Sequence, residues 1–317
     1  MILQPSNVME LSQALAAASA RRAPVASVDL HALNRIVRHS PEDMTVTVEA
    51  GLPLASLQTQ LARAGQWLPV DPPHAERLTL GALLDTDASG PRRFGCGTVR
   101  DYLLGLTVVL ADGRVIHSGG RVVKNVAGYD LLKLFIGARG TLGVIVEATF
   151  KLLPRPAAEE FVQARRASLA DADTLIESVL RSEVTPVVLD LHNLDAHGNA
   201  DDSYHVVLGF AGTREEVDWQ LAQVGALGIS EPAGLDHEIN FHSESAGPPP
   251  VHCSVLPSRL GEMLRELGRV PFVARAGNGV ILHRGRKPAP APPATAGLAR
   301  RIKETFDPNR LFPELTV

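Results

Sequence analysis

The uneven distribution of glycine is the feature that most constrains this chain. The first fifty residues contain no glycine, whereas the segment 119–145, GGRVVKNVAGYDLLKLFIGARGTLGVI, contains six. Glycine adopts positive φ freely and leaves the backbone uncovered, so glycine-rich segments are where a chain can bring its amide groups close to a ligand. The segment 119–145 is therefore a candidate cofactor loop.

The glycines at 137, 140 and 143 do not fit the dinucleotide-binding fingerprint. Their spacing differs from G-x-G-x-x-G, and they lead into a β-rich run where that fingerprint opens a helix. Glycines at this spacing still allow a turn with positive φ and exposed amides, which a bulky planar ligand can approach. Taken alone, this stretch is equally consistent with a structural turn between a helix and a strand.

The composition is that of an ordinary globular protein. The chain has 317 residues, 45% of them hydrophobic and 21% charged, which is enough for two domains with a sizeable core. A net charge of -4 gives no reason to expect nucleic acid. Cys96 and Cys253 lie far apart and no secretory leader is recognised, so we expect no disulfide framework and a cytoplasmic location. No apolar run reaches the roughly 20 residues that span a bilayer, so we expect no direct membrane span, and any membrane association would come through partner subunits.

The hydrophobic pattern changes its rhythm near residue 154, where we expect a domain boundary. The elements expected before it are helices at 8–20, 54–66 and 130–140, strands at 45–54 and 141–154, and a hairpin around 111–113. Residues 68–101 lack clear periodicity and are expected to form a long ordered loop region. From 161 to 228 the expected order is strand, helix, strand, strand, helix, which is typical of a small antiparallel α+β layer.

Three loops of small residues follow one another in that aperiodic region. They are Thr79–Gly81, Ala88–Pro91 and Gly95–Asp101, and hydroxyl side chains lie beside their exposed amides. A diphosphate or a ribityl chain needs many weak donors at close range more than it needs one strong charge. These loops therefore favour a nucleotide-like cofactor.

At this point the sequence resembles a known family. The elements PPH, SGPRR, TVRD, VVKNVAGYDL and GTLGVI occur in order within residues 72–156, and the tail contains DPNRLFPE. This run resembles the FAD-binding domain of the vanillyl-alcohol-oxidase (PCMH) type, most closely that of the accessory subunits of bacterial glycolate oxidases. The resemblance implies an α+β fold in which a PCMH-type FAD-binding domain of two α/β subdomains (1–154) precedes a smaller antiparallel α+β cap domain (155–284). A Pro/Ala connector and tail (285–317) would return to the FAD domain.

The resemblance also implies the cofactor, FAD held without a covalent link, and its contacts. The implied cofactor-binding residues are Thr79, Leu80, Gly81, Ser89, Gly90, Gly97, Thr98, Val99, Asp101, Gly140, Thr141, Gly143, Val144 and Ile145. For each of them, turn geometry or packing is the alternative interpretation. Lys124 and Asn125 are candidates for contact with the cofactor or a partner chain, Tyr129 and Asp130 for a helix cap, and His74 for the flavin edge. Cys96 is not expected to anchor the flavin.

The sequence departs from the family's pattern in two places. The residues Ala23 to Leu30 pass directly from one extended segment to the next, without the glycine-rich loop that wraps the FAD pyrophosphate in this fold. Without glycine the main chain is not expected to approach a pyrophosphate closely, so FAD binding should be weakened. In the second domain, the run ARAGNGVILHRG offers Asn278 and His283 but no clustered acid. We therefore identify no catalytic residues and no metal ligands.

The resemblance implies a subunit of a hetero-oligomeric glycolate oxidase-type complex that oxidises a 2-hydroxy acid. The chain would bind FAD and relay electrons, or assist assembly, beside a catalytic flavoprotein subunit and an iron-sulfur subunit. The alternative is a non-catalytic structural subunit that has lost tight FAD binding. A self-sufficient flavin reductase of the cell-wall precursor type ranks lower, because neither its proton donor nor its own pyrophosphate loop is apparent.

Overall fold

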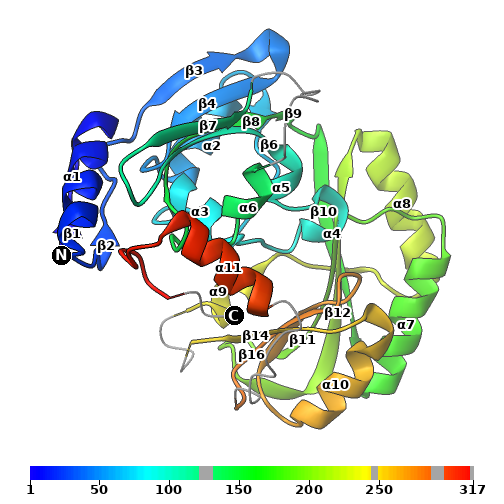
Figure 1. Cartoon of the computed structure of the whole chain (residues 1–317). Helices are drawn as coiled ribbons and strands as arrows, with labels where there is room; N and C mark the ends of the chain where they lie inside the picture. Colours follow the sequence, from blue (N-terminus) through cyan, green and yellow to red (C-terminus); the bar gives the residue numbers. More distant parts are fainter. Residues whose placement is uncertain (121–130, 244–248, 287–295, 315–317) are drawn as a thin grey trace. The chain divides into compact units, whose positions relative to one another are not determined.

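The computed structural model describes residues 1–120, 131–243, 249–286 and 296–314 (Figure 1). The chain divides into two compact units. Unit 1 comprises residues 1–88, 98–155 and 290–317, and unit 2 comprises residues 89–97 and 156–289. Residues 89–97 thus group with unit 2, whereas the sequence pattern places them inside the first domain.

Unit 1 is built on a five-stranded antiparallel sheet in the order β3-β4-β8-β6-β7. The strands are β3 (Ile36–Ser40), β4 (Thr45–Glu49), β6 (Leu103–Val109), β7 (Val115–Gly119) and β8 (Val144–Lys151). β6 and β7 form the expected hairpin, in which Gly113 has a φ of +85°. Two-residue strands add a parallel pair, β1 (Ile2–Leu3) with β2 (Ser27–Val28), and an antiparallel pair, β5 (Gln66–Trp67) with β9 (Leu153–Pro154).

Helices cover both faces of this sheet. The larger core lies against α2 (Leu54–Ala62), α3 (Leu80–Thr86), α5 (Val99–Tyr102) and α6 (Leu132–Phe135). A smaller core joins α1 (Val8–Arg21) to the tail residues Leu311 and Phe312. The expected helix at 8–20 is confirmed, and the side chain of its cap, Asn7, accepts a hydrogen bond from the amide of Glu10 at 2.9 Å.

The aperiodic region 68–101 is not a continuous loop, which corrects the sequence-based expectation. It contains α3, α4 (Arg93–Cys96) and α5, each too short to show a helical repeat of apolar residues. α3 begins at a local signal, because the Thr79 hydroxyl accepts a hydrogen bond from the amide of Ala82 at 3.2 Å. It ends where Asp87 takes a left-handed conformation with φ of +52°.

The last described helix, α11 (Ala296–Phe306), belongs to unit 1. Its Lys303 side chain is buried and donates hydrogen bonds to the carboxylate of Asp307 at 2.6 Å and to the carbonyl of Thr141 at 2.8 Å. This bonding fixes the tail beside the loop that precedes β8. Leu311 and Phe312 pack in the smaller core against strand residues of the unit 1 sheet.

Unit 2 contains a seven-stranded antiparallel sheet in the order β13-β10-β12-β11-β15-β16-β14. The strands are β10 (Ala158–Arg166), β11 (Val188–Leu194), β12 (Ala200–Gly212), β13 (Glu231–Pro232), β14 (Val251–Ser254), β15 (Phe272–Arg275) and β16 (Val280–His283). The helices α7 (Leu169–Arg181), α8 (Arg214–Ala226) and α10 (Leu260–Leu267) share one apolar core with the sheet. The predicted fold class, mixed helix and antiparallel sheet, is confirmed.

Side chains alternate between the two faces of the unit 2 sheet, and the faces differ in kind. On β11, Leu189 and Leu191 face the apolar core, whereas Asp190 and His192 face the opposite side. That opposite face carries α9 (Asp236–Phe241). A sheet of this kind places polar groups on one buried face, where each must find a partner. No helix among the described residues is both long and apolar enough to cross a bilayer.

Candidate functional site

A cavity of about 360 Å³ lies in unit 1, within the size range of pockets for small ligands and cofactors. Three segments line it: residues 25–31, residues of α3 and its cap between 79 and 85, and residues of the loop and strand between 139 and 145. Phe312 and Pro313 of the tail complete the wall. The cavity thus gathers residues from both ends and the middle of the chain.

Part of the predicted cofactor site lies in this cavity. The predicted residues that line it are Thr79, Gly81, Gly140, Gly143, Val144 and Ile145. They come from two of the loops that the sequence singled out, and the fold of unit 1 brings these loops together. Their role in binding a cofactor remains a prediction.

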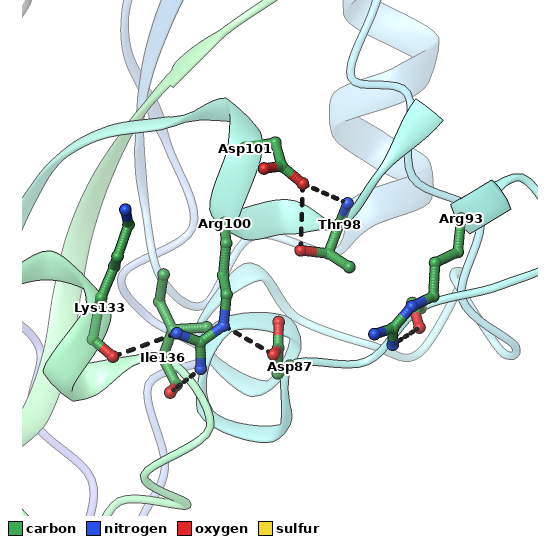
Figure 2. A network of polar contacts seen from close by, with 8 residues as sticks. Asp87, Arg93, Thr98, Arg100, Asp101, Lys133 and Ile136 are labelled. Carbon is green, nitrogen blue, oxygen red and sulfur yellow. Dashed lines mark hydrogen bonds and ion pairs between the residues drawn. The ribbon is translucent and has the colours of Figure 1, made fainter. Parts of the chain in front are cut away.

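Other predicted residues of unit 1 serve the fold itself. Leu80 and Val99 are fully buried in the larger core. The hydroxyl of Thr141 donates to the carbonyl of Ala138 at 2.7 Å. Thr98 and Asp101 form a capping box at the start of α5, where the Asp101 carboxylate accepts the Thr98 amide at 2.8 Å (Figure 2).

Arg100, which the sequence did not single out, organises the same part of unit 1. Figure 2 shows its guanidinium bonded to the carboxylate of Asp87 at 2.8 Å and to the carbonyl of Ile136 at 2.7 Å. A third bond reaches the carbonyl of Lys133 at 3.3 Å. Arg100 therefore joins the end of α3 to the last turn of α6, and so positions the glycine loop that follows.

Several candidates lie elsewhere. Ser89, Gly90 and Gly97 belong to unit 2, where the Ser89 hydroxyl accepts a hydrogen bond from Arg93 at 3.1 Å and Gly97 ends α4. His74 and Cys96 do not line the unit 1 cavity. The candidates Lys124, Asn125, Tyr129 and Asp130 lie outside the described residues.

The segment 25–31, which lacks the glycine-rich loop of the family, nevertheless lines the cavity. It occupies one side of the cavity, and it lies close because Gly51 has no side chain: a Cβ there would come within 1.9 Å of the Leu30 carbonyl oxygen. Four of its amides, however, are used inside the protein. Those of Val25, Ala26 and Asp29 donate to carbonyls of Leu311, Met1 and Leu3, each at 2.8 Å, and that of His31 donates to the Asp29 carboxylate at 3.0 Å. The wall is present, but these donors are not free for a pyrophosphate.

Asp85 is the cavity residue that sequence reasoning missed. It lies in the last turn of α3, lines the cavity, and accepts a hydrogen bond on its carboxylate from the amide of Gly140. Burial raises the pKa of Asp85 to about 7, and the Gly140 hydrogen bond offsets only part of that rise. Among the described residues no ion pair includes Asp85. Its place in DTDASG gave no signal, because short acidic stretches are common in loops.

Unit 2 holds a second cluster, which corrects the expectation that no acids gather there. Asp190, His237 and Glu238 are buried, and they offer ligand atoms within 4.8 Å of one another. The acids lie on β11 and α9, far apart in sequence, so spacing could not reveal them. The ARAGNGVILHRG run does contribute Arg275, which ends β15.

Arg275 already supplies the cation of this cluster. Its Nη1 atom lies 2.6 Å from the Asp190 carboxylate and 2.8 Å from that of Glu238. His237 Nε2 lies 3.0 Å from the same Asp190 oxygen. Burial acts to raise the pKa of Glu238, but Arg275 together with His237 and His242 holds that pKa below its ordinary value. The side chains fit an internal ion-pair network better than a metal site.

A cavity of about 430 Å³ in unit 2 lies against three histidines. The rings of His205, His192 and His237 are stacked, with centroids 4.9 and 4.7 Å apart and planes within 6° of parallel. Burial holds the pKa of His192 well below its ordinary value. Imidazoles bind metal ions in the plane of the ring, so parallel rings at this separation do not converge on one ion.

Comparison with known proteins identifies an FAD-binding domain in the first part of the chain. Residues 12–119 match the family described as FAD binding domain. Glycolate oxidase subunit GlcE of Escherichia coli is 40% identical over 147 residues, which are 46% of this chain and 42% of that protein. Glycolate oxidase subunit GlcD of Bacillus subtilis is 34% identical over 158 residues, which are 50% of this chain and 34% of that protein. The chain therefore spans less than half the length of these relatives.

Solved structures support the fold independently. Two crystal structures of alkyldihydroxyacetonephosphate synthase have TM-scores of 0.75 and 0.76 and cover 98% of this chain and about three quarters of their own. Their identities of 19% and 17% make this a likeness of fold alone. The family match confirms the predicted FAD-binding domain and its cofactor, FAD, and the matched region ends before the glycine loop at 137–143.

Proposed function

We propose that this chain, which carries an FAD-binding domain homologous to the glycolate oxidase subunits GlcE and GlcD, is the FAD-binding subunit of a glycolate oxidase-type complex. The complex would oxidise a 2-hydroxy acid, with this chain beside a catalytic flavoprotein subunit and an iron-sulfur subunit. The role of this chain within the complex would be to relay electrons or to assist assembly. We place the complex in the cytoplasm or at a membrane through its partner subunits.

The unit 1 cavity is the observation that carries this proposal. Two predicted cofactor loops meet there, and each brings glycine to the wall: Gly81 on α3, and Gly140 and Gly143 before β8. Gly140 has a φ of +67°, a conformation that a residue with a side chain rarely adopts. FAD, when bound, supplies a group that accepts and passes on electrons. The chain's own residues would orient it and shield it from water.

A structural subunit that binds FAD weakly is the second candidate. The engaged amides of segment 25–31 favour it, because a pyrophosphate needs donors that the protein has not already used. The Asp85 carboxylate in the same cavity favours it as well. The two candidates differ in one measurable quantity, the flavin content of this chain inside its complex.

The test is to produce the chain together with its catalytic and iron-sulfur partners and to count the FAD released on denaturation. We expect one FAD per copy of this chain beyond that of the catalytic subunit. Ala82→Phe, which places a large ring at the cavity wall, should remove that FAD, whereas Ala17→Phe on the exposed face of α1 should not. A complete complex without this FAD would contradict the leading proposal and support the structural role. Dye reduction with glycolate and with D-lactate would identify the hydroxy acid.

A further inference from the structure

We propose that the Asp85 carboxylate is an internal anion that occupies the Gly140 amide and thereby limits how tightly the unit 1 cavity holds a diphosphate. This inference rests on the proposed function, in that FAD is taken as the ligand of the cavity. It assigns to Asp85 a role in specificity, because the residue would lower the affinity of the cavity for the negatively charged diphosphate of the cofactor.

The geometry around the end of α3 brings the two groups together. The Gly137 amide donates a hydrogen bond to the Leu84 carbonyl at 2.8 Å. The Arg139 amide donates a hydrogen bond to the Asp85 carbonyl, also at 2.8 Å. These bonds hold the glycine loop on the last turn of α3. The Asp85 carboxylate in turn accepts a hydrogen bond from the amide of Gly140, the residue after Arg139. A Cβ at Gly140 would lie 3.7 Å from Asp85 Oδ2, so the carboxylate contacts the loop directly.

The Gly140 amide matters because neighbouring donors are already engaged. The amide of Gly81 donates to the Ala50 carbonyl at 2.7 Å, and that of Ala82 donates to the Thr79 hydroxyl at 3.2 Å. Across the cavity, the four amides of segment 25–31 described above are bonded within the protein. A diphosphate at this wall therefore competes with Asp85 for the Gly140 amide.

Charge acts in the same direction as geometry. The acids of the cavity wall are Asp85 and Asp29, and Arg139 and His31 are the groups there that can carry positive charge. Asp29 is bonded to His31, with Oδ2 3.0 Å from Nδ1, and its side chain is 42% exposed. Asp85 forms no ion pair with a described residue, so its charge is not offset. A diphosphate beside it meets like charge where water screens poorly.

Protonation of Asp85 would remove its charge and weaken the hydrogen bond from Gly140, although the neutral carboxyl keeps an acceptor oxygen. Because burial raises its pKa to about 7, the carboxylate is mostly charged at pH 8.5 and mostly neutral at pH 6. Diphosphate binding should therefore tighten as the pH falls through 7. Protonation of His31 would act in the same direction, so the pH effect must be measured with and without Asp85.

The experiment measures the binding of FAD, ADP and riboflavin to the full chain at pH 8.5 and pH 6. ADP carries the diphosphate without the flavin, and riboflavin carries the flavin without the diphosphate. Asp85→Ala frees the Gly140 amide and removes the charge, whereas Asp85→Asn removes the charge but keeps an acceptor. Asp29→Asn is the matched control, since it removes a carboxylate from the same wall without touching Gly140.

At pH 8.5 we expect Asp85→Ala to bind FAD and ADP roughly 10- to 100-fold more tightly than the wild type, the range of a hydrogen bond to a charged group. Asp85→Asn should fall between the two, and riboflavin binding should not change. At pH 6 the gap between the wild type and Asp85→Ala should narrow to about the gap between Asp85→Asn and Asp85→Ala, because the neutral carboxyl, like the amide, keeps an acceptor. The pH profile of the wild-type chain tests the proposal even if a variant fails to fold.

Equal FAD affinity of wild type and Asp85→Ala at pH 8.5 would overturn the inference and leave the proposed function intact. An equal gain from Asp29→Asn would show that overall charge acts, not the bond to Gly140, and would overturn it too. If neither the wild type nor Asp85→Ala binds FAD or ADP, the inference fails. The flavin count of the assembled complex then decides the proposed function separately.

Discussion

Asp85 in unit 1, which is partly buried, and Glu238 in unit 2, which is buried, are two carboxyl groups with different partners. Glu238 lies 2.8 Å from a buried guanidinium, and its pKa is lowered from 4.5. Asp85 has an amide donor but no cationic partner among the described residues, and burial raises its pKa from 3.8 to about 7. A nearby guanidinium thus favours the ionised form of Glu238 more than a single amide donor favours that of Asp85.

The comparison also separates what the two units are suited to do. In unit 2 the buried charges are met within the protein, so the cluster holds the sheet and α9 together. In unit 1 a titratable group faces a cavity, an arrangement common at functional sites.

The chain has two tryptophans, Trp67 in unit 1 and Trp219 in unit 2. Trp219→Phe or Trp67→Phe leaves one fluorescent reporter for each unit.

The largest loss of stability is expected when the buried carboxyl groups of unit 2 lose their cationic partner and so come to resemble Asp85 of unit 1. Arg275→Met leaves Asp190 and Glu238 buried without their cation, which should lower the free energy of unfolding by about 3–5 kcal/mol. Urea unfolding followed at Trp219 measures it. Arg259→Met, which breaks only the exposed pair with Glu262, should cost less than about 1 kcal/mol. If the two variants lost equal free energy of unfolding, the buried network would contribute no more to stability than an exposed ion pair does.

The next effect concerns pH and has opposite signs in the two units. The native pKa of Asp85 is raised, so the native state retains a proton that the unfolded chain loses, and the free energy of unfolding falls as the pH rises from about 4 to about 7. The loss should be of the order of 2–4 kcal/mol in the wild type and absent in Asp85→Asn, as measured at Trp67.

For Glu238 the native pKa is lowered, so its contribution is present above about pH 4.5 and is lost as the pH falls below it. Acid should therefore weaken the unit 2 network while it relieves Asp85. If the wild type and Asp85→Asn changed in stability by the same amount between pH 5 and pH 8.5 at Trp67, the account of Asp85 would be contradicted.

The smallest effect tests an exposed carboxyl. Asp101 resembles Asp85 in accepting one amide, but it is solvated, so its bond serves only to cap α5. Asp101→Ala should lower the free energy of unfolding by about 1 kcal/mol, and Asp101→Asn, which keeps an acceptor, by less. Thermal unfolding at fixed pH measures both. A loss as large as that of Arg275→Met would show that this capping box matters more than solvent exposure allows.

The sequence predicted the elements with regular patterns and failed where contacts join distant segments. The helix at 8–20, the hairpin around 111–113 and the alternation on β11 follow from local periodicity, which side-chain burial enforces. The short helices of region 68–101 escaped because a helix of four to seven residues shows no repeat.

Part of the candidate cavity could be predicted, because its two loops carry recognisable motifs. Two residues of one loop, Thr79 and Gly81, and four of the other, Gly140, Gly143, Val144 and Ile145, line the same cavity, and their role in cofactor binding stays a prediction. Asp85 and the Asp190–Glu238–Arg275 network were not predictable, since each depends on residues brought together only by the sheet register or by the end of a helix. The engaged amides of segment 25–31 are likewise invisible in sequence.

The tail that Lys303 fixes has a consequence for the order of events during synthesis. The Val25 amide is bonded to the Leu311 carbonyl, and Phe312 and Pro313 form part of the cavity wall. Residues 311–313 emerge from the ribosome after all of unit 2. The early segment 25–31 therefore lacks its contacts with them until some 280 intervening residues have been translated. The cavity wall is therefore complete only after residues 311–313 have been synthesised.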